Sequence, residues 1–189
     1  MADENDFEAI EATLKRSIAA FRDADVPALL GGSLAIWARG GPETRHDLDF
    51  MVKPEDAERA LDALEAIGMR PERPPEGWLF KAWDADVLVD LIFAPRGLEM
   101  TDEVLARGDD REVLSISTRV MALEDVFSTK LLALDEHRLD YSGLLLMARS
   151  LREQIDWEAL RQRTEGSPFA RAFFVLCEEL DISAPVPAP

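Results

Sequence analysis

Two aspartates, Asp47 and Asp49, alternate with apolar residues in the segment Asp47 to Val52. Alternate side chains of a β-strand share a face, so the segment predicts both carboxylates on one face of a sheet. Two like charges so close together repel each other, and a bound divalent cation relieves that repulsion. Carboxylate oxygens on a rigid strand suit Mg²⁺, or Mn²⁺, with phosphate and water as further ligands. The pair therefore indicates a metal site, against the plainer alternative of an edge strand with a polar face.

A third aspartate, Asp90, lies in the middle of the apolar segment Val87 to Phe93. An aspartate there should be buried, where an unpaired charge is costly, so it must be protonated, paired or bound to metal. If its strand neighbours that of Asp47 and Asp49, three carboxylates converge on one place. Such a cluster could hold two metal ions that stabilise the attacking and leaving oxygens of a phosphoryl transfer.

The turn Gly31-Gly32-Ser33 follows the apolar segment Val26 to Leu30, which predicts a short buried strand. Two glycines and a serine at the start of a helix expose backbone N–H groups that can bind phosphate. We expect Ser33 to cap that helix. Gly-Gly-Ser alone is ordinary turn composition, but its combination with the three aspartates is more specific.

Lys130 would lie near the middle of an apolar helical stripe formed by Leu123, Phe127, Leu131 and Leu134. It is either a lysine at the edge of the stripe whose charged end reaches water, or a cation directed into a cleft between two parts of the chain. In the second case it would bind nucleotide phosphate.

Two further pairs of residues have open roles. Arg45 and His46 lie next to the aspartate pair. They would either bind a phosphate group or the molecule that accepts a transferred group, or they would remain solvated at the surface. Trp78 and Trp83 are expected to pack, although a tryptophan at the rim of a cleft could stack on a base.

Composition narrows the class of protein. The 189 residues include 38 acidic and 21 basic side chains, a net charge of −17, and 47% are hydrophobic, which excludes wholesale disorder. The acidity argues against extended nucleic-acid binding but permits cationic substrates and divalent metals. One cysteine, Cys177, cannot form an internal disulfide, so we expect a buried thiol and a cytoplasmic protein. We expect neither a signal peptide nor a membrane span.

The order of patterns predicts an α/β (α+β) fold. We expect a core at 1–121 with a small mixed sheet flanked by helices, then a C-terminal helical region at 122–184 and a disordered tail at 185–189. The expected strands are 26–30, 47–52, 78–83, 87–93 and 113–120, and the first helix covers 4–24. Caps are expected at Asp156 and Ser167, and the last helix should carry one apolar stripe formed by Phe169, Phe173, Leu176 and Leu180.

The same residues resemble a known family. The resemblance rests on the segment GGSLAIWARGGPETRHDLDFMV, followed by VLVDLIF, which is similar to the DNA polymerase β-like nucleotidyltransferase superfamily. It implies a small mixed sheet flanked by helices, two Mg²⁺ ions, and transfer of a nucleoside monophosphate from an NTP with release of pyrophosphate. Gly32 and Ser33 match the phosphate-binding turn, Asp47 and Asp49 the two metal ligands, and Asp90 the third carboxylate.

Two subfamilies share further segments. The stretch ETRHDLDF looks like the TR…DLD segment of aminoglycoside and lincosamide nucleotidyltransferases. The stretch LEDVFSTKLLALDEHRLDYSGLLLMARSLREQIDW resembles the helical region of abortive-infection-type nucleotidyltransferase toxins, with Lys130 at their lysine. The substrate-recognition segments of neither subfamily can be matched, so the acceptor does not carry over.

The leading hypothesis is a Mg²⁺-dependent nucleotidyltransferase that moves a nucleoside monophosphate from an NTP to a hydroxyl of a small acceptor, which the charge would allow to be cationic. An alternative is a toxin that modifies tRNA or a protein, with an antitoxin partner, and a third is a non-catalytic binding or antitoxin module. In the leading hypothesis Asp47, Asp49 and Asp90 bind metal and catalyse, while Gly31, Gly32, Ser33 and Lys130 bind the nucleotide.

Overall fold

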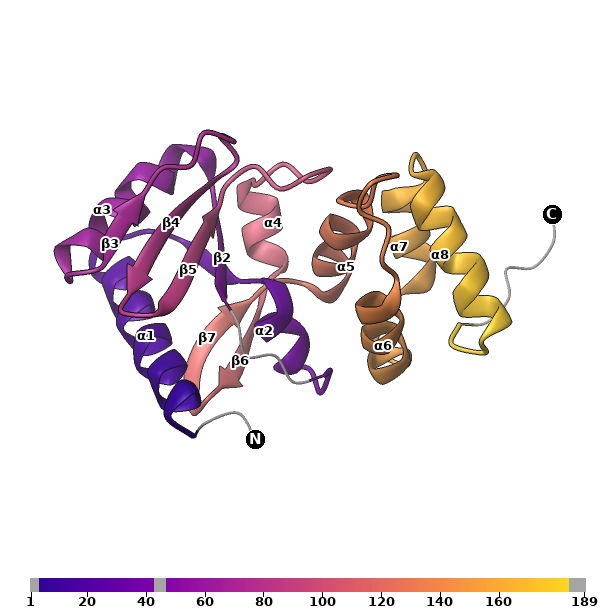
Figure 1. Ribbon diagram of the computed structural model, residues 1–189, viewed down its shortest axis with the longest axis horizontal. Helices are drawn as coiled ribbons and strands as arrows, with labels where there is room; N and C mark the ends of the chain where they lie inside the picture. Colours follow the sequence, from indigo (N-terminus) through magenta and orange to yellow (C-terminus); the bar gives the residue numbers. More distant parts are fainter. Residues whose placement is uncertain (1–3, 43–46, 184–189) are drawn as a thin grey trace.

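The computed structural model describes residues 4–42 and 47–183, and places a seven-stranded mixed sheet beside a group of helices (Figure 1). The strand order is β3-β4-β5-β2-β1-β7-β6. The pairs β2–β5 and β1–β7 are parallel and the other neighbours are antiparallel. The strands are β1 (Ala28–Leu30), β2 (Leu48–Val52), β3 (Arg70–Glu72), β4 (Leu79–Asp84), β5 (Val87–Ile92), β6 (Asp109–Val113) and β7 (Ile116–Val120). The predicted mixed sheet is therefore confirmed.

The expected extended segment 113–120 is wrong in one respect, because it contains a reversal. Leu114 and Ser115 both have positive φ angles, 50° and 60°, and join β6 to β7 as a two-residue hairpin turn. Such a turn matches the twist of antiparallel strands but usually carries glycine or asparagine. Because neither is present here, the sequence shows no turn at this place. The short edge strand β3 was also not expected.

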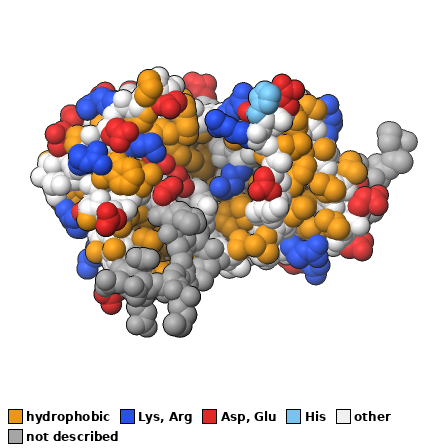
Figure 2. Space-filling model, viewed as in Figure 1, with side chains coloured by type: hydrophobic (Ala, Val, Ile, Leu, Met, Phe, Trp, Pro, Cys, Tyr) orange, Lys and Arg blue, Asp and Glu red, His pale blue; other side chains and the backbone are white. Residues whose placement is uncertain are grey.

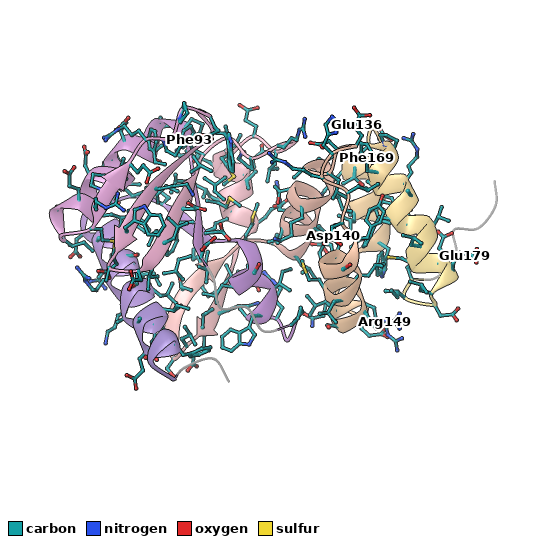
Figure 3. All side chains as sticks on the ribbon, viewed as in Figure 1. Phe93, Glu136, Asp140, Arg149, Phe169 and Glu179 are labelled. Atoms are coloured by element: carbon teal, nitrogen blue, oxygen red, sulfur yellow. The ribbon has the colours of Figure 1, made fainter. Side chains whose placement is uncertain are left out.

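Helices cover the sheet and continue beyond it. The helices α1 and α3 pack against each other and onto the β4–β5 part of the sheet, while α2 packs on β2 and α5. Side chains fill the space between these layers (Figure 3). The helical elements are α1 (Glu4–Asp23), α2 (Gly32–Trp37), the 3₁₀ turn η1 (Pro54–Asp56), α3 (Ala57–Ala66), α4 (Asp102–Arg107), α5 (Leu123–Leu132), α6 (Ser142–Leu151), α7 (Trp157–Thr164) and α8 (Pro168–Glu179).

All seven strands precede α5, and α5 to α8 form the helical part of the described chain. The caps at Asp156 and Ser167 are confirmed, since each side chain accepts a hydrogen bond from the backbone N–H three residues later. The expected tail at 185–189 lies outside the described residues. Within the described ranges, no helix has both the length and the apolar character needed to cross a membrane.

The buried face of α8 differs from the expected stripe. Leu176 and Leu180 are 37% and 43% exposed, whereas Phe173, Phe174 and Cys177 are buried. Apolar residues occur on more than one side of this helix, so spacing alone allows two stripes. The contacts of α8 with α5 and α7 select the stripe that contains Cys177, and the expected burial of its thiol is confirmed.

The orientation of α5 is set by ion pairs between one buried aspartate and two partly exposed arginines. Asp125, on α5, is 1% exposed and pairs with Arg107 of α4 at 3.0 Å and with Arg163 of α7. A buried carboxylate is stable only when its charge is compensated. Two arginines from different elements therefore hold α5 between the sheet side and the helical side, and α5 is the helix that carries Lys130.

Candidate active site

Asp49 and Asp90 lie side by side in the middle of the sheet. The parallel pairing of β2 with β5 aligns Asp49 directly with Asp90. Asp47 comes immediately before β2, and its side chain is exposed. The strand of Asp90 is thus a neighbour of the strand of Asp49. The sequence analysis predicts that the carboxylates converge if these two strands are neighbours.

The electrostatic environment of Asp49 disfavours its charged form. Burial raises the pKa of this carboxyl from 3.8 to about 6, and the negative charges of Asp90 and Asp47 add to the rise. The positive charges of Lys130 and Lys81 act in the opposite direction. All three aspartates therefore influence one another, as neighbouring like charges do.

Asp90 has a partner that the sequence analysis did not identify. The Lys81 ammonium group donates a hydrogen bond of 2.9 Å to Asp90 Oδ1, and the two side chains are 25% and 13% exposed. Burial nevertheless raises the pKa of Asp90, against the lowering effect of Lys81. The hairpin of β4 and β5 places Lys81 opposite Asp90, because Asp84 still belongs to β4 and pairs with Val87. The strands expected at 78–83 and 87–93 would shift this register by one residue, so the sequence did not indicate the pair.

The glycine turn packs directly against Asp49. The Gly31 N–H donates a 2.7 Å hydrogen bond to the Asp49 carbonyl. Gly32 has a φ of +57°, and a Cβ atom there would lie 1.7 Å from Asp49 Oδ2. Only glycine meets both conditions, the left-handed backbone and the absence of a side chain. The turn and Asp49 are therefore packed directly against each other.

The predicted cap at Ser33 is wrong. The helix α2 begins at Gly32, and Gly31 occupies the N-cap position without a side-chain hydrogen bond. Because the chain enters the helix through the left-handed Gly32, Ser33 falls inside the first turn, where its side chain is partly exposed.

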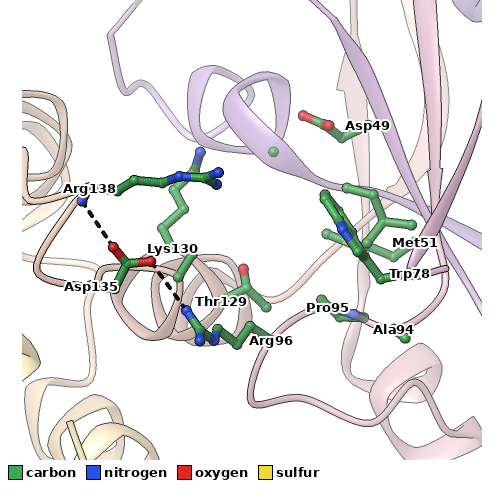
Figure 4. Close-up of a pocket in the computed structure, with 13 residues that line it drawn as sticks. Asp49, Met51, Trp78, Ala94, Pro95, Arg96, Thr129, Lys130, Asp135 and Arg138 are labelled. Carbon is green, nitrogen blue, oxygen red and sulfur yellow. Dashed lines mark hydrogen bonds and ion pairs between the residues drawn. The ribbon is translucent and has the colours of Figure 1, made fainter. Parts of the chain in front are cut away.

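A cavity of about 510 Å³ lies between the sheet and α5 (Figure 4). Its charged lining residues are Asp49, Arg96, Lys130, Asp135 and Arg138. The remaining lining residues are Gly32, Met51, Trp78, Ile92, Ala94, Pro95, Thr129 and Ala133. The space-filling view shows a hollow with basic side chains at the same junction (Figure 2). This size is typical of small-molecule pockets.

The cavity gathers only some of the residues that the sequence singles out. Of those that the structure describes, the lining contains Gly32, Asp49, Trp78 and Lys130. Those outside the lining are Gly31, Ser33, Asp47, Trp83 and Asp90. Arg45 and His46 lie outside the described residues.

Lys130 extends from α5 into the space that faces Asp49 (Figure 4), and its charge lowers the pKa of Asp49. This geometry agrees with the interpretation of Lys130 as a cation directed into a cleft.

Arg96 and Arg138 are cavity residues that sequence reasoning missed. Asp135 links them, because it accepts a 3.0 Å hydrogen bond from the backbone N–H of Arg138 and lies 3.8 Å from Arg96 Nη1 (Figure 4). Both arginines come from connecting segments without regular periodicity, so no sequence signal marked them. The cavity therefore has three basic side chains and two acidic ones.

No group of three histidine, cysteine, aspartate or glutamate side chains among the described residues is arranged to hold a metal ion. In the same structure one oxygen of Asp90 is engaged by Lys81. The chemistry of the donors still suits a hard divalent cation, because Asp49 and Asp90 are adjacent carboxylates whose pKa values are raised.

A mixed sheet with Asp49 and Asp90 on neighbouring strands, beside a glycine turn and a cavity, has the features expected of a nucleotidyltransferase. Over residues 4–186 the chain matches the family described as "Uncharacterised nucleotidyltransferase", and it belongs to that family of enzymes. None of the curated proteins matches the chain in sequence.

Several solved structures share the fold. The crystal structure of ANT(2″)-Ia in complex with adenylyl-2″-tobramycin is 16% identical with a TM-score of 0.63, and the match covers 86% of this chain and 98% of that one. The solution structure of ANT(2″)-Ia gives 16% identity, a TM-score of 0.61, and coverage of 90% and 96%. The lincomycin-bound lincosamide adenylyltransferase LnuA is 12% identical with a TM-score of 0.50, and coverage is 86% and 98%. The resemblance to aminoglycoside and lincosamide nucleotidyltransferases is thus confirmed at the level of fold, and the resemblance to abortive-infection toxins stays a prediction.

Proposed function

We propose that this enzyme transfers a nucleoside monophosphate from an NTP to a hydroxyl group of a small acceptor, in a reaction that depends on Mg²⁺ or Mn²⁺ and releases pyrophosphate. The observation that carries the proposal is the alignment of Asp49 with Asp90. Asp49 lines a cavity that also contains Gly32 and Lys130. This arrangement brings together carboxylates, a close backbone approach and a cation, which are the groups that phosphoryl-type transfers require.

Asp49 and Asp90 would hold the metal, together with Asp47 from the segment before β2. The mutual repulsion of these carboxylates supports this assignment, since Asp90 and Asp47 both raise the pKa of Asp49. When bound, the metal supplies positive charge that neutralises phosphate oxygens and activates a hydroxyl group. Asp90 would exchange its Lys81 contact for this ligand.

The remaining groups of the site would bind the triphosphate and accept the proton of the acceptor hydroxyl. The backbone at Gly31, Gly32 and Ser33 would approach the triphosphate closely, and the Lys130 ammonium group would bind its charge. Asp90 would accept the proton of the acceptor hydroxyl while the oxygen of that hydroxyl forms a bond to the α-phosphorus. The bond between that phosphorus and the bridging oxygen breaks, and pyrophosphate leaves with the electron pair.

The acceptor is proposed to be a small molecule. The cavity volume of about 510 Å³ supports this size class, and two structural neighbours were solved with adenylyl-2″-tobramycin and with lincomycin. The expectation of a cationic acceptor stays a prediction, and the cavity lining does not add to it, because three of its five charged groups are basic. Modification of tRNA or of a protein is the alternative outcome of the same test.

The test incubates the protein with Mg²⁺ and each α-labelled NTP in a cell extract, then separates small molecules, RNA and protein. We expect label in a small molecule, and we expect Asp90→Asn to abolish it while the circular dichroism spectrum is retained. Asp110→Asn, at an exposed position of β6, is the matched control and should transfer normally. Label in RNA or protein would support the toxin-type alternative, and full activity of Asp90→Asn would contradict the assigned base.

A further inference from the structure

The cavity has two walls of different chemistry. The side formed by the sheet and the segment after β5 is mainly apolar, with Met51, Trp78, Ile92 and Pro95, and its charged residues are Asp49 and Arg96. The opposite side, formed by α5 and the segment after it, contributes the cations Lys130 and Arg138 and the acidic Asp135. Figure 4 shows Trp78 next to Met51, across the open space from α5. A ligand that fills this space would therefore contact an apolar surface on one side and cations on the other.

Trp78 is unusual among the residues of the apolar wall because it is large and 41% exposed. Its backbone is held in place, since the N–H groups of Phe93 and Ala94 both donate hydrogen bonds of 3.1 Å to its carbonyl oxygen. An exposed indole on a fixed backbone offers an aromatic face without a large ordering cost. Such a face suits stacking of a flat ring, and every nucleobase has one.

We propose that Trp78 forms the nucleobase subsite of this enzyme, with the base stacked on the indole and the triphosphate directed toward Lys130 and Arg138. The inference rests on the proposed function, because it assumes that an NTP is the donor. An NTP has a flat apolar end and a strongly anionic end. The two walls match these ends, and a cavity of about 510 Å³ has room for one such molecule.

Stacking tolerates all bases, so the subsite would strengthen NTP binding without selecting one base strictly. A base on Trp78 also leaves the Asp49 end of the cavity for the phosphates. The donor would then lie across the cavity from the apolar wall to the glycine turn, and its α-phosphate could approach the carboxylates.

The test compares two kinds of probe in the presence of Mg²⁺. The first kind is the four nucleoside triphosphates, and the second is inorganic tripolyphosphate, which has no base. Binding is measured by calorimetry and by quenching of tryptophan fluorescence. The variants are Trp78→Ala, Trp78→Phe, Lys130→Met, and Trp83→Phe as the control. Trp83 lies on the same strand β4, and its Nε1–H donates to Glu72 Oε2 at 3.1 Å. Because Trp78 is 41% exposed, its variants should fold, which circular dichroism checks.

We expect Trp78→Ala to weaken NTP binding by about 5- to 100-fold and to leave tripolyphosphate binding unchanged. Trp78→Phe should retain most of the affinity but lose the fluorescence quenching, whereas Trp83→Phe should keep both. Lys130→Met should weaken both probes. Unchanged NTP affinity in Trp78→Ala, or an equal loss for tripolyphosphate, would overturn the subsite and leave the proposed function intact. Failure of the unaltered protein to bind either probe would overturn both.

Discussion

The charge of Asp49 should destabilise the metal-free protein. A variant without this charge should therefore have a larger free energy of unfolding, and the increase measures the destabilisation. Burial is the largest cause of the rise in its pKa from 3.8 to about 6. The variant Asp49→Asn keeps the shape of the side chain and removes the ionisable group. We therefore expect this variant to be more stable than the unaltered protein in a metal-free buffer, although Asp49 is assigned to the catalytic site.

The magnitude and the sign follow from the difference in proton binding. The native state holds the Asp49 proton more tightly than the unfolded state, so stability falls as the pH rises from about 4 to about 6. Since one pKa unit corresponds to about 1.4 kcal/mol, the full penalty is at most about 3 kcal/mol at about pH 8. At about pH 5 the native carboxyl is mostly protonated, and the penalty is about half as large.

The assay is urea unfolding in EDTA, followed by far-ultraviolet circular dichroism at both pH values. The stability gain of Asp49→Asn should be about 1 to 1.5 kcal/mol larger at about pH 8 than at about pH 5. Asp110→Asn, on the edge strand β6, controls for a general effect of lowering the net negative charge. A gain that is the same at both pH values, or one that Asp110→Asn reproduces, would refute the reasoning.

Three further predictions concern the glycine turn, the Asp125 network and the buried thiol. Gly32→Ala should abolish the rise in melting temperature that Mg²⁺ and NTP cause, because its Cβ would lie 1.7 Å from Asp49 Oδ2; Ser33→Ala should reduce that rise only modestly, and equal small effects would mean that the turn is only structural. Asp125→Ala should lower the free energy of unfolding by about 2 to 3 kcal/mol, because it leaves two arginines without their buried partner; a change in urea unfolding below about 1 kcal/mol would contradict this role. Burial raises the pKa of the Cys177 thiol to about 12, so a chromogenic disulfide reagent should react slowly with the native protein and rapidly after denaturation, and rapid native reaction would show an accessible thiol.

The local elements could be predicted because their signals lie within a few residues of each other. The alternation around Asp49 and the apolar segment around Asp90 predicted β2 and β5. The apolar segment at 78–83, separated from β5 by a short polar stretch, predicted β4, but the register that pairs Lys81 with Asp90 was not predicted, because Asp84 belongs to β4 and pairs with Val87. In each case the deciding interaction is a side-chain period or a turn, which acts over a short stretch of chain.

The arrangement of these elements was decided by tertiary structure. Nothing in the sequence states that β2 pairs in parallel with β5, and this pairing is what aligns Asp49 with Asp90. The placement of Arg96, Trp78 and Arg138 around one cavity depends on α5, whose position is set by the ion pairs of a buried aspartate with two distant arginines. Tertiary structure also decided which face of α8 is buried. Two apolar stripes agree with the helical period, and the contacts of α8 with α5 and α7 bury one of them. Contacts between residues far apart in the chain select among locally equivalent patterns, because burial and charge compensation depend on what lies across the interface.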